Sequence, residues 1–398
     1  MRLFKNVRLI EGGTVAPASV LIRDRVIEAV LPWDTDTRAE EITDCGGLYL
    51  APGLIELHAH GGNGYDVMDC TEEAIGHVAE YHLLHGVTTF YPTTSTDSFD
   101  SIRRVTDACR NVSKQREARQ NIPGVHIEGQ YIAEARDGGM YKKYIKSPDP
   151  KEYGPLIGYA DGWIKRWSIA PELPGGLAFG DYCREHGIVC SVAHSDATYD
   201  EVKKARKHGF SHLTHFYSDM NSVTRRNGFR TMGAIEAGYD FDDLWIELIG
   251  DGCHIPPELM DFLYRHIGPG RMHLVSDTVR VAGTAKEGEL VDVGSRDRQL
   301  QGIIEDGVVK FLDRSAFHGS IASGIELIRA THLKAGIPLG DCVRMMTENP
   351  AKIMGIGGEK GHVLPGYDAD LILFDDEIRL KEVYYRGNSV CAESAHNS

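Results

Sequence analysis

Six side chains that can bind metal ions occur at the ends of strand-like apolar runs in this chain. They are His58 and His60 in GLIELHAH, Glu128 in GVHIEG, His194 in IVCSVAH, His215 in HLTHF and Asp277 in MHLVSD. The carboxyl ends of the strands of a parallel barrel meet at one face, so side chains at these positions converge. Imidazoles and carboxylates are the usual ligands of catalytic zinc. The pattern predicts a metal hydrolase built in a barrel.

Taken singly, the six residues differ in how strongly each indicates a metal site. Residues i and i+2 of a strand share a face, so both imidazoles of the HxH pair can point at one ion, but many sheets carry such pairs. Glu128 can bridge two cations with one oxygen on each, or form a structural salt bridge. A lone histidine is more often a core residue, yet His194 and His215 lie at the strand ends of two consecutive βα units, which favours a role as metal ligands. Asp277 is the expected catalytic acid and base, because a carboxylate beside a metal ion can take a proton from water and pass it to a leaving amine.

The roles of three further histidines remain open at this point. His254 follows the seventh strand and either orients a substrate or caps the helix that begins in PPELMDFLYRH. His126 lies two residues before Glu128 on the same face, and we expect it to donate a hydrogen bond to a metal ligand. His212 lies three residues before His215, on the opposite face of its strand, so we expect a structural role.

The middle of the chain alternates strand-like runs with amphipathic helical stretches. Strands are expected to end near residues 57, 93, 128, 170, 193, 216, 250 and 276. Eight βα units in a row favour a parallel (β/α)8 barrel over a doubly wound open sheet, because ligands from strands 1, 3, 5, 6 and 8 converge only in a closed circle. Short β-branched runs at both ends predict one small β-sandwich. We expect a sandwich from 1–52 and 362–398, a barrel from 53–361, and a flap or hairpin inserted over Val279–Ser315.

Composition excludes several classes of partner. The 398 residues carry a net charge of −15, whereas nucleic acids and anionic membranes require a basic patch. Eight cysteines without a CxxC pair indicate reduced thiols, which are typical of a cytoplasmic protein. The N-terminus has a strand pattern rather than a signal peptide, and no window approaches the ~20 apolar residues of a membrane span.

Taken together, these motifs resemble the amidohydrolase superfamily, and within it the N-acetylglucosamine-6-phosphate deacetylases. The resemblance covers nearly the whole chain, including APGLIELHAHGGNGYDVMD, GVHIEGQ, APEL, AHSDA, THFYSDM, GDGCHI, LVSDT, HGS and TENPAKIMGI. It implies a distorted (β/α)8 TIM barrel with a small β-sandwich, a homodimer, and hydrolysis of the acetamide of an amino sugar such as N-acetylglucosamine.

The resemblance also implies roles for single residues. Glu128, His194 and His215 match the ligands of the metal site shared across the family. His58 and His60, with Glu128 and Asp277, match the second site of binuclear members, so one or two divalent ions are expected, zinc first, with iron, manganese or cobalt as alternatives. The implied substrate contacts are His254 and Arg226, the latter reaching the sugar phosphate in the neighbouring subunit.

Four residues depart from the family pattern. Gln130 replaces the proline of HLEGP, and Met140 stands where the family has a substrate-contacting histidine. Ser218 and Asp219 replace an Asn-Ala pair that normally lies by the phosphate. An aspartate there repels a phosphate dianion unless a neighbouring cation such as Arg226, Arg225 or Lys142 compensates. The alternatives are an amidohydrolase acting on a cyclic amide, dipeptide or other N-acyl compound, a deaminase, or a metal-free binding scaffold, which the retention of all six ligands disfavours.

Overall fold

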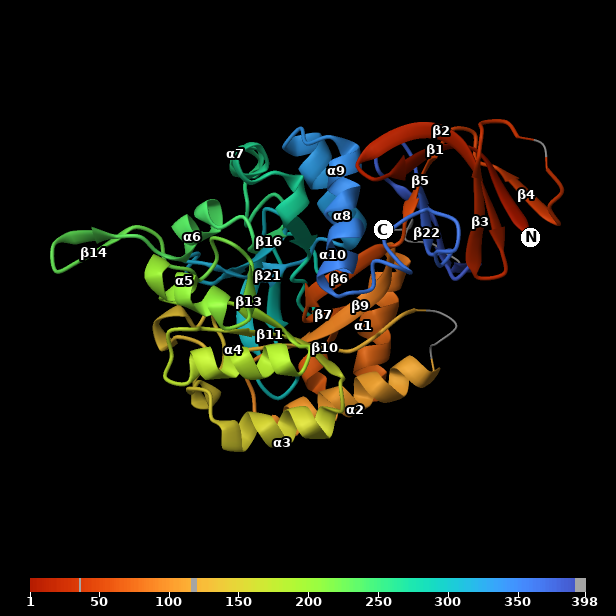
Figure 1. Ribbon diagram of the computed structural model, residues 1–398. Coiled ribbons are helices and arrows are strands. Elements are labelled where there is room, and N and C mark those ends of the chain that lie inside the picture. The colour runs from red at the N-terminus through yellow and green to blue at the C-terminus, as the bar shows by residue number, and fades with distance from the viewer. Residues whose placement is uncertain (36, 116–119, 391–398) are drawn as a thin grey trace.

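The computed structural model describes residues 1–35, 37–115 and 120–390, and its centre is a parallel barrel (Figure 1). Every pairing within the barrel sheet is parallel, in the order β17-β16-β13-β12-β11-β10-β9-β6. The strands are β6 (Leu54–Ala59), β9 (Val87–Thr94), β10 (Val125–Glu128), β11 (Ile164–Ile169), β12 (Val189–Val192), β13 (Phe210–Leu213), β16 (Trp245–Ile249) and β17 (Met272–Val275). Each ends within three residues of the position expected from the sequence, so the barrel prediction is confirmed.

Helices follow the strands and cover the outside of the barrel. They are α1 (Glu72–Leu84), α2 (Phe99–Gln115), α3 (Pro150–Ala160), α4 (Gly176–Glu185), α5 (Tyr199–Lys207), α6 (Ala234–Asp240), α7 (Pro257–Ile267) and α8 (Gly324–Arg329), followed by α9 (Leu339–Arg344) and α10 (Glu348–Ile353). Side chains cap their first turns: Thr71 accepts from Ala74 N at α1, and Thr198 forms a capping box with Glu201 at α5. Gly86 follows α1 with φ +94°, a left-handed conformation that glycine adopts without a Cβ penalty.

The barrel closes between β6 and β17 without a regular ladder. The main-chain hydrogen bonds between the two segments lie at the carboxyl ends of the strands, among them those from Asp277 N to His58 O (2.9 Å) and from His60 N to Thr278 O (2.8 Å). Lower down, the main chain before α10 replaces the missing pairing, because Ile55 N bonds to the carbonyl of Met346. The closure therefore lies directly under the HxH pair and Asp277.

Both ends of the chain contribute to one separate sheet of eight strands, which confirms the predicted small β domain built from the two ends. Its strands are β1 (Arg2–Glu11), β2 (Thr14–Arg23), β3 (Val26–Leu31), β4 (Glu41–Asp44), β5 (Tyr49–Pro52), β22 (Leu371–Phe374), β23 (Leu380–Tyr385) and β24 (Asn388–Val390). The antiparallel pairing of β5 with β22 joins the two ends, and residues including Phe4, Leu50 and Leu371 form its own apolar core. The exact division of the chain into domains at residues 52 and 361 stays a prediction.

The insertion after β17 is larger than the expected flap or hairpin. It forms a four-stranded antiparallel sheet of β18 (Leu290–Val293), β19 (Leu300–Glu305), β20 (Val308–Phe311) and β21 (Phe317–Ser320). This sheet has its own small apolar core, which includes Val279, Val293 and Ile304. That small core explains why the segment is a sheet and not a flexible flap.

Short elements occupy the remaining connections. They are the strands β7 (Gly61–Gly62), β8 (Tyr65–Asp66), β14 (Thr224–Arg226) and β15 (Phe229–Thr231), the 3-10 turns η1 (Val67–Asp69), η2 (Glu134–Arg136), η3 (Lys142–Tyr144) and η4 (Pro269–Arg271), and the π turn η5 (Ala330–Lys334). The hairpin β14–β15 extends away from the barrel, at the left of Figure 1.

No helix within the described ranges is long and apolar enough to cross a membrane. The seven cysteines in the described part of the chain are free thiols, and Cys391 lies outside it.

Candidate metal centre and active site

The six predicted ligands meet at the carboxyl ends of the barrel strands and form two adjoining clusters. The first cluster is His58, His60 and Asp277, and the second is Glu128, His194 and His215. Within each cluster the ligand atoms lie within 4.8 Å of one another. They come from β6, β10 and the residues just after β12, β13 and β17, so five separate segments build one site.

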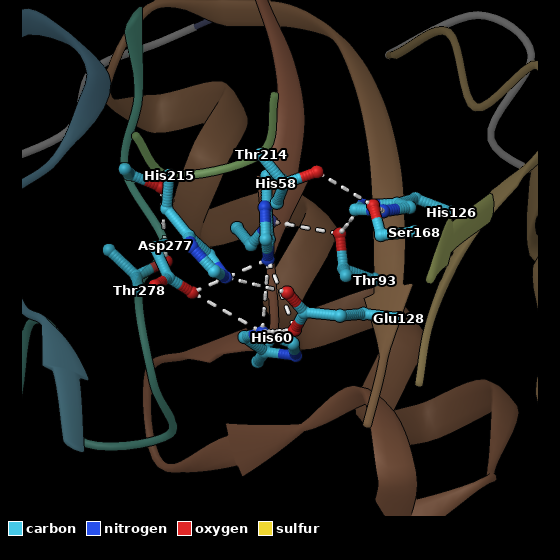
Figure 2. A network of polar contacts seen from close by, with 12 residues as sticks. His58, His60, Thr93, His126, Glu128, Ser168, Thr214, His215, Asp277 and Thr278 are labelled. Carbon is cyan, nitrogen blue, oxygen red and sulfur yellow. Dashed lines mark hydrogen bonds and ion pairs between the residues drawn. The ribbon is translucent and has the colours of Figure 1, made fainter. Parts of the chain in front are cut away.

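Glu128 lies between the two clusters, with one carboxylate oxygen facing each. Its Oε1 is 3.0 Å from Nε2 of His215 and 3.4 Å from Nε2 of His194. Its Oε2 is 3.1 Å from Nε2 of His60 and 3.3 Å from Nε2 of His58, as Figure 2 shows for the labelled residues. Asp277 closes the first cluster, with Oδ1 3.2 Å from Nε2 of His60.

The spacing of the imidazole nitrogens fits a cation at each cluster. The Nε2 atoms of His58 and His60 are 3.3 Å apart, and those of His194 and His215 are 3.2 Å apart. Two ligands that each bind one zinc at about 2.0–2.1 Å in tetrahedral geometry lie roughly 3.4 Å from each other. Both clusters therefore have the donor types and the spacing that a divalent ion requires.

Hydrogen bonds on the outer side of the rings orient three of these histidines. Nδ1 of His58 contacts Oε1 of Glu247 at 2.8 Å, Nδ1 of His194 contacts the carbonyl of Arg136 at 2.7 Å, and Nδ1 of His215 contacts the carbonyl of Ser218 at 3.2 Å. When Nδ1 donates outward, Nε2 keeps its lone pair toward the centre.

The two carboxylates are held in the ionised form. Burial alone would raise the pKa of Glu128, but the neighbouring His58 charge and hydrogen bonds from His194 and His215 outweigh it and hold that pKa well below its usual value. Burial also opposes ionisation of Asp277, and the charges of His58 and His60 together with a hydrogen bond from His60 still lower its pKa. Ionised carboxylates can bind metal ions, and Asp277 can accept a proton.

Three ligands occupy left-handed backbone conformations. The φ angles of His194, His215 and Asp277 are +44°, +29° and +50°, each at the point where the chain leaves its strand. Such conformations cost non-glycine residues on the order of 1–3 kcal/mol and cluster at active sites. The sequence gives no sign of this turn, which aims the side chains across the barrel mouth.

A cavity of about 800 Å³ opens above the clusters. Of the residues expected at the substrate, Met140, Ser218, Asp219 and His254 all line it. The inserted sheet supplies one wall through residues 293–295, 297–300 and 316–319. Six lining carboxylates face three lining cations, which favours the binding of positive ions: Asp66, Asp97, Glu128, Asp219, Asp277 and Asp297 against Lys142, Lys143 and Arg298.

His254 faces the cavity and does not cap α7. Its Nδ1 bonds to Oδ2 of Asp251 at 2.7 Å, whereas α7 begins after Pro256 without any side-chain cap. Burial opposes protonation, yet the charge of Asp251 and the hydrogen bond to it raise the pKa of His254. The capping alternative is therefore wrong, and contact with a substrate stays a prediction.

His126 does not hydrogen-bond to a metal ligand, so that expectation is wrong. Its ring nitrogens contact Thr93 Oγ1 (3.2 Å) and Ser168 Oγ (2.7 Å), as Figure 2 shows. Its ring packs edge-on against His58, with centroids 4.7 Å apart. His212 is buried and bonds to Ser211 Oγ, which agrees with a structural role.

Arg226 does not line the cavity of its own chain. It lies on β14 of the projecting hairpin, is about half exposed, and donates from Nη2 to the carbonyl of Asp196 (3.1 Å) and to Oδ2 of that residue (3.4 Å). Its predicted role at a neighbouring subunit stays a prediction.

Sequence reasoning missed Glu247 and Asp251, which hold His58 and His254. Glu247 interrupts the apolar run WIELIG on β16, and a lone carboxylate in a buried strand is the signal that could have identified it. Asp251 follows the same strand in GDGCH, where an aspartate beside glycines is equally typical of a turn.

Comparison with known proteins identifies the family. The sequence pattern of the amidohydrolase family matches residues 49–395. The chain belongs to the amidohydrolase family. It is 30% identical to the N-acetylglucosamine-6-phosphate deacetylase of Lysinibacillus sphaericus over 86% of this chain and 85% of that protein. It is 25% identical to the N-acetylgalactosamine-6-phosphate deacetylase of Escherichia coli O157:H7, over 95% and 96% of the two chains.

A solved structure confirms the fold of this amidohydrolase. The N-acetyl-D-glucosamine-6-phosphate deacetylase of Mycobacterium smegmatis superimposes with a TM-score of 0.87 over 98% of each chain, at 24% identity. Amidohydrolases are metal-dependent, and both clusters of this chain offer suitable ligands. The chain is therefore a hydrolase that acts on carbon–nitrogen bonds.

Proposed function

We propose that this amidohydrolase removes the acetyl group from an N-acetylated amino sugar, N-acetylglucosamine-6-phosphate or a related N-acetylhexosamine. The observation that carries the proposal is Glu128, whose two oxygens each face a separate ligand cluster below one cavity. Relatives named for deacetylation of two epimeric sugar phosphates support the substrate class. The reaction adds water across the amide, breaks the C–N bond, and yields acetate and the free amine.

Two divalent ions fit the site, one per cluster, with zinc as the first expectation and iron, manganese or cobalt as alternatives. His58, His60 and Asp277 would hold one ion, His194 and His215 the other, and Glu128 would bridge them. When bound, such ions supply a nucleophilic water at neutral pH and polarise the acetamide carbonyl.

Proton transfer falls to Asp277. Its carboxylate is ionised and 14% exposed, so it can reach a reacting group in the cavity and take the proton of the attacking water. The same carboxyl group then returns that proton to the departing nitrogen, which leaves as an amine. His254 faces the same cavity from beyond β16, and protonation favoured by Asp251 lets its ring donate to a substrate oxygen.

A homodimer would complete the site. The hairpin β14–β15 is an isolated two-stranded unit, which is marginally stable by itself, and Phe229 at its end is 78% exposed. Packing of the hairpin against a second copy of the chain would bury Phe229. It would also place Arg226 near the cavity of that second copy rather than near the cavity of its own chain. Cytoplasmic location, expected from the cysteine pattern, stays a prediction.

The experiment is acetate release by enzyme reconstituted with each candidate metal. Four substrates form the panel: N-acetylglucosamine and N-acetylgalactosamine, each with and without a 6-phosphate. We expect acetate from at least one, and none after chelation. Release of ammonia instead of acetate would indicate a deaminase, and no product from any of the four would end the amino-sugar proposal.

A further inference from the structure

The interior of the barrel beneath the site is polar rather than aliphatic. Branched apolar residues dominate the interiors of most (β/α)8 barrels. Here Glu56, His126, Arg166, Glu247 and His273 are each at most 1% exposed. Buried charges are costly unless they are paired and hydrogen-bonded, so such a set requires a reason.

Glu247 is the member that contacts both ligand clusters. One oxygen, Oε1, lies 2.8 Å from Nδ1 of His58 in the first cluster and accepts a hydrogen bond of 3.0 Å from the main-chain N–H of His215 in the second. The other oxygen, Oε2, forms an ion pair with Arg166. A single carboxylate from β16 thus joins β6, β11 and the chain after β13 across the barrel.

Arg166 is fixed in turn. Its Nη2 donates to Thr214 Oγ1 at 3.1 Å, and Thr214 Oγ1 contacts Ser168 Oγ at 2.9 Å. Ser168 then contacts His126, whose ring packs on His58. Figure 2 shows Thr214, Ser168 and His126 in this arrangement beside His58. The guanidinium keeps Glu247 charged and prevents its carboxylate from rotating away from His58.

We propose that Glu247 is a positioning residue for the metal site of the first cluster, with a smaller effect on the second through the main chain of His215. Its Oε1 holds His58 as the Nδ1–H tautomer, so that Nε2 faces the ion of the first cluster, and the same oxygen fixes the main chain that carries His215. The first cluster depends on it more, because there Glu247 contacts the ligating side chain itself, whereas at His215 it contacts only the backbone. Removing such a partner typically weakens metal affinity by about 10- to 100-fold.

Glu56 provides a matched control. It is also fully buried and accepts two N–H groups, from His58 N (2.9 Å) and Ser276 N (3.0 Å), but it touches no imidazole ring. Glu56→Gln therefore tests burial and backbone support near His58 without changing the ring contact that the proposal requires.

The experiment is a titration of the metal-free full-length protein with Zn²⁺ against a chromophoric chelator, repeated with Co²⁺ by absorption spectroscopy. Glu247→Gln leaves Arg166 without a counter-charge and can lose its fold, so the double variant Glu247→Gln/Arg166→Met, which removes both charges, is measured as well. His58→Ala assigns which ion belongs to the first cluster.

We expect one ion to bind about 10- to 100-fold more weakly in the Glu247 variants, the same ion that His58→Ala loses, with an altered cobalt spectrum. The other ion should stay within a few-fold of wild type, and Glu56→Gln should bind both. The proposal would be overturned if the Glu247 variants lost both ions equally or lost neither, or if Glu56→Gln showed the same loss. It would also be overturned if the wild-type protein bound a single ion that His58→Ala still binds. The inference rests on the proposed metal centre but not on the substrate, so a protein that binds two ions without releasing acetate contradicts only the proposed function.

Discussion

Oδ1 of Asp277 lies 3.2 Å from Nε2 of His60, at the seam where β17 meets β6. The contact places the only cavity-facing carboxylate of the first cluster beside its HxH pair, at a position from which it can both bind an ion and exchange a proton with a reacting group.

Asp277→Asn should lower the kcat of deacetylation by about 10²- to 10⁴-fold, the usual contribution of a general acid and base. The amide keeps the shape and one oxygen ligand but cannot accept a proton. KM should change little, because substrate contacts elsewhere in the cavity remain. Acetate release and bound metal would be measured on the same sample, and a variant with full metal content and wild-type kcat would exclude Asp277 as the base.

Asp251→Asn should shift the pH profile of kcat/KM. Asp251 raises the pKa of His254, so wild-type His254 stays protonated to higher pH than an ordinary histidine. Loss of the carboxylate lowers that pKa, and the alkaline limb of the profile should then move to lower pH, if a protonated ring contacts the substrate. His254→Gln, which cannot titrate, serves as the control and should lack this limb. An unmoved limb in Asp251→Asn would show that His254 is not the titrating group.

The metal ligands could be predicted from the sequence, whereas the residues that hold them could not. His58, His194 and Asp277 each follow an apolar run, and strand ends of a parallel barrel meet whatever the details of packing. Glu247 lies 189 residues from His58, and only the closure of the barrel brings Glu247 on β16 beside His58 on β6. Local spacing carries no such information, so the polar interior of the barrel could not be predicted from the sequence.

Two other features were set by tertiary contacts rather than by local pattern. The residues from 279 to 320 form a sheet because Val281 and Val309 share a small core, and the sequence of the segment alone suggested a flap or hairpin. His254 was equally compatible with a cap and a site residue, because the double proline after it marks a helix start without showing where the ring points.

His82 should make the protein lose stability in acid. Burial lowers the pKa of this imidazole from 6.5 to about 3, and its ring stacks on Phe90 within the barrel wall. A histidine whose folded pKa is depressed gives full stability above the unfolded value of 6.5, and stability falls as pH decreases toward 3. The slope for one proton is about 1.4 kcal/mol per pH unit.

The measurement is urea unfolding of wild type and His82→Gln at pH 7 and pH 5. The variant should show the smaller loss between the two, with His266→Gln on the exposed side of α7 as the control that leaves the loss unchanged. Identical pH dependence in wild type and His82→Gln would show that this ring does not contribute.

Asp219→Asn should favour phosphorylated over unphosphorylated substrates. The carboxylate lines the cavity, and its Oδ2 lies 3.8 Å from Nδ1 of His194 in the second cluster, so its negative charge lies beside the space above the ligands. If the 6-phosphate lies near it, removing the charge should lower KM for the phosphorylated sugar by about tenfold at low salt, because repulsion between like charges a few ångströms apart reaches about 1 kcal/mol or more. KM for the neutral sugar should stay the same or rise through loss of a hydrogen-bond acceptor.

Asp297→Asn removes a charge from another part of the same cavity and controls for a general electrostatic effect. An equal change in both variants would mean that Asp219 does not distinguish the two substrates, and its position would then reflect support of the turn after β13 alone.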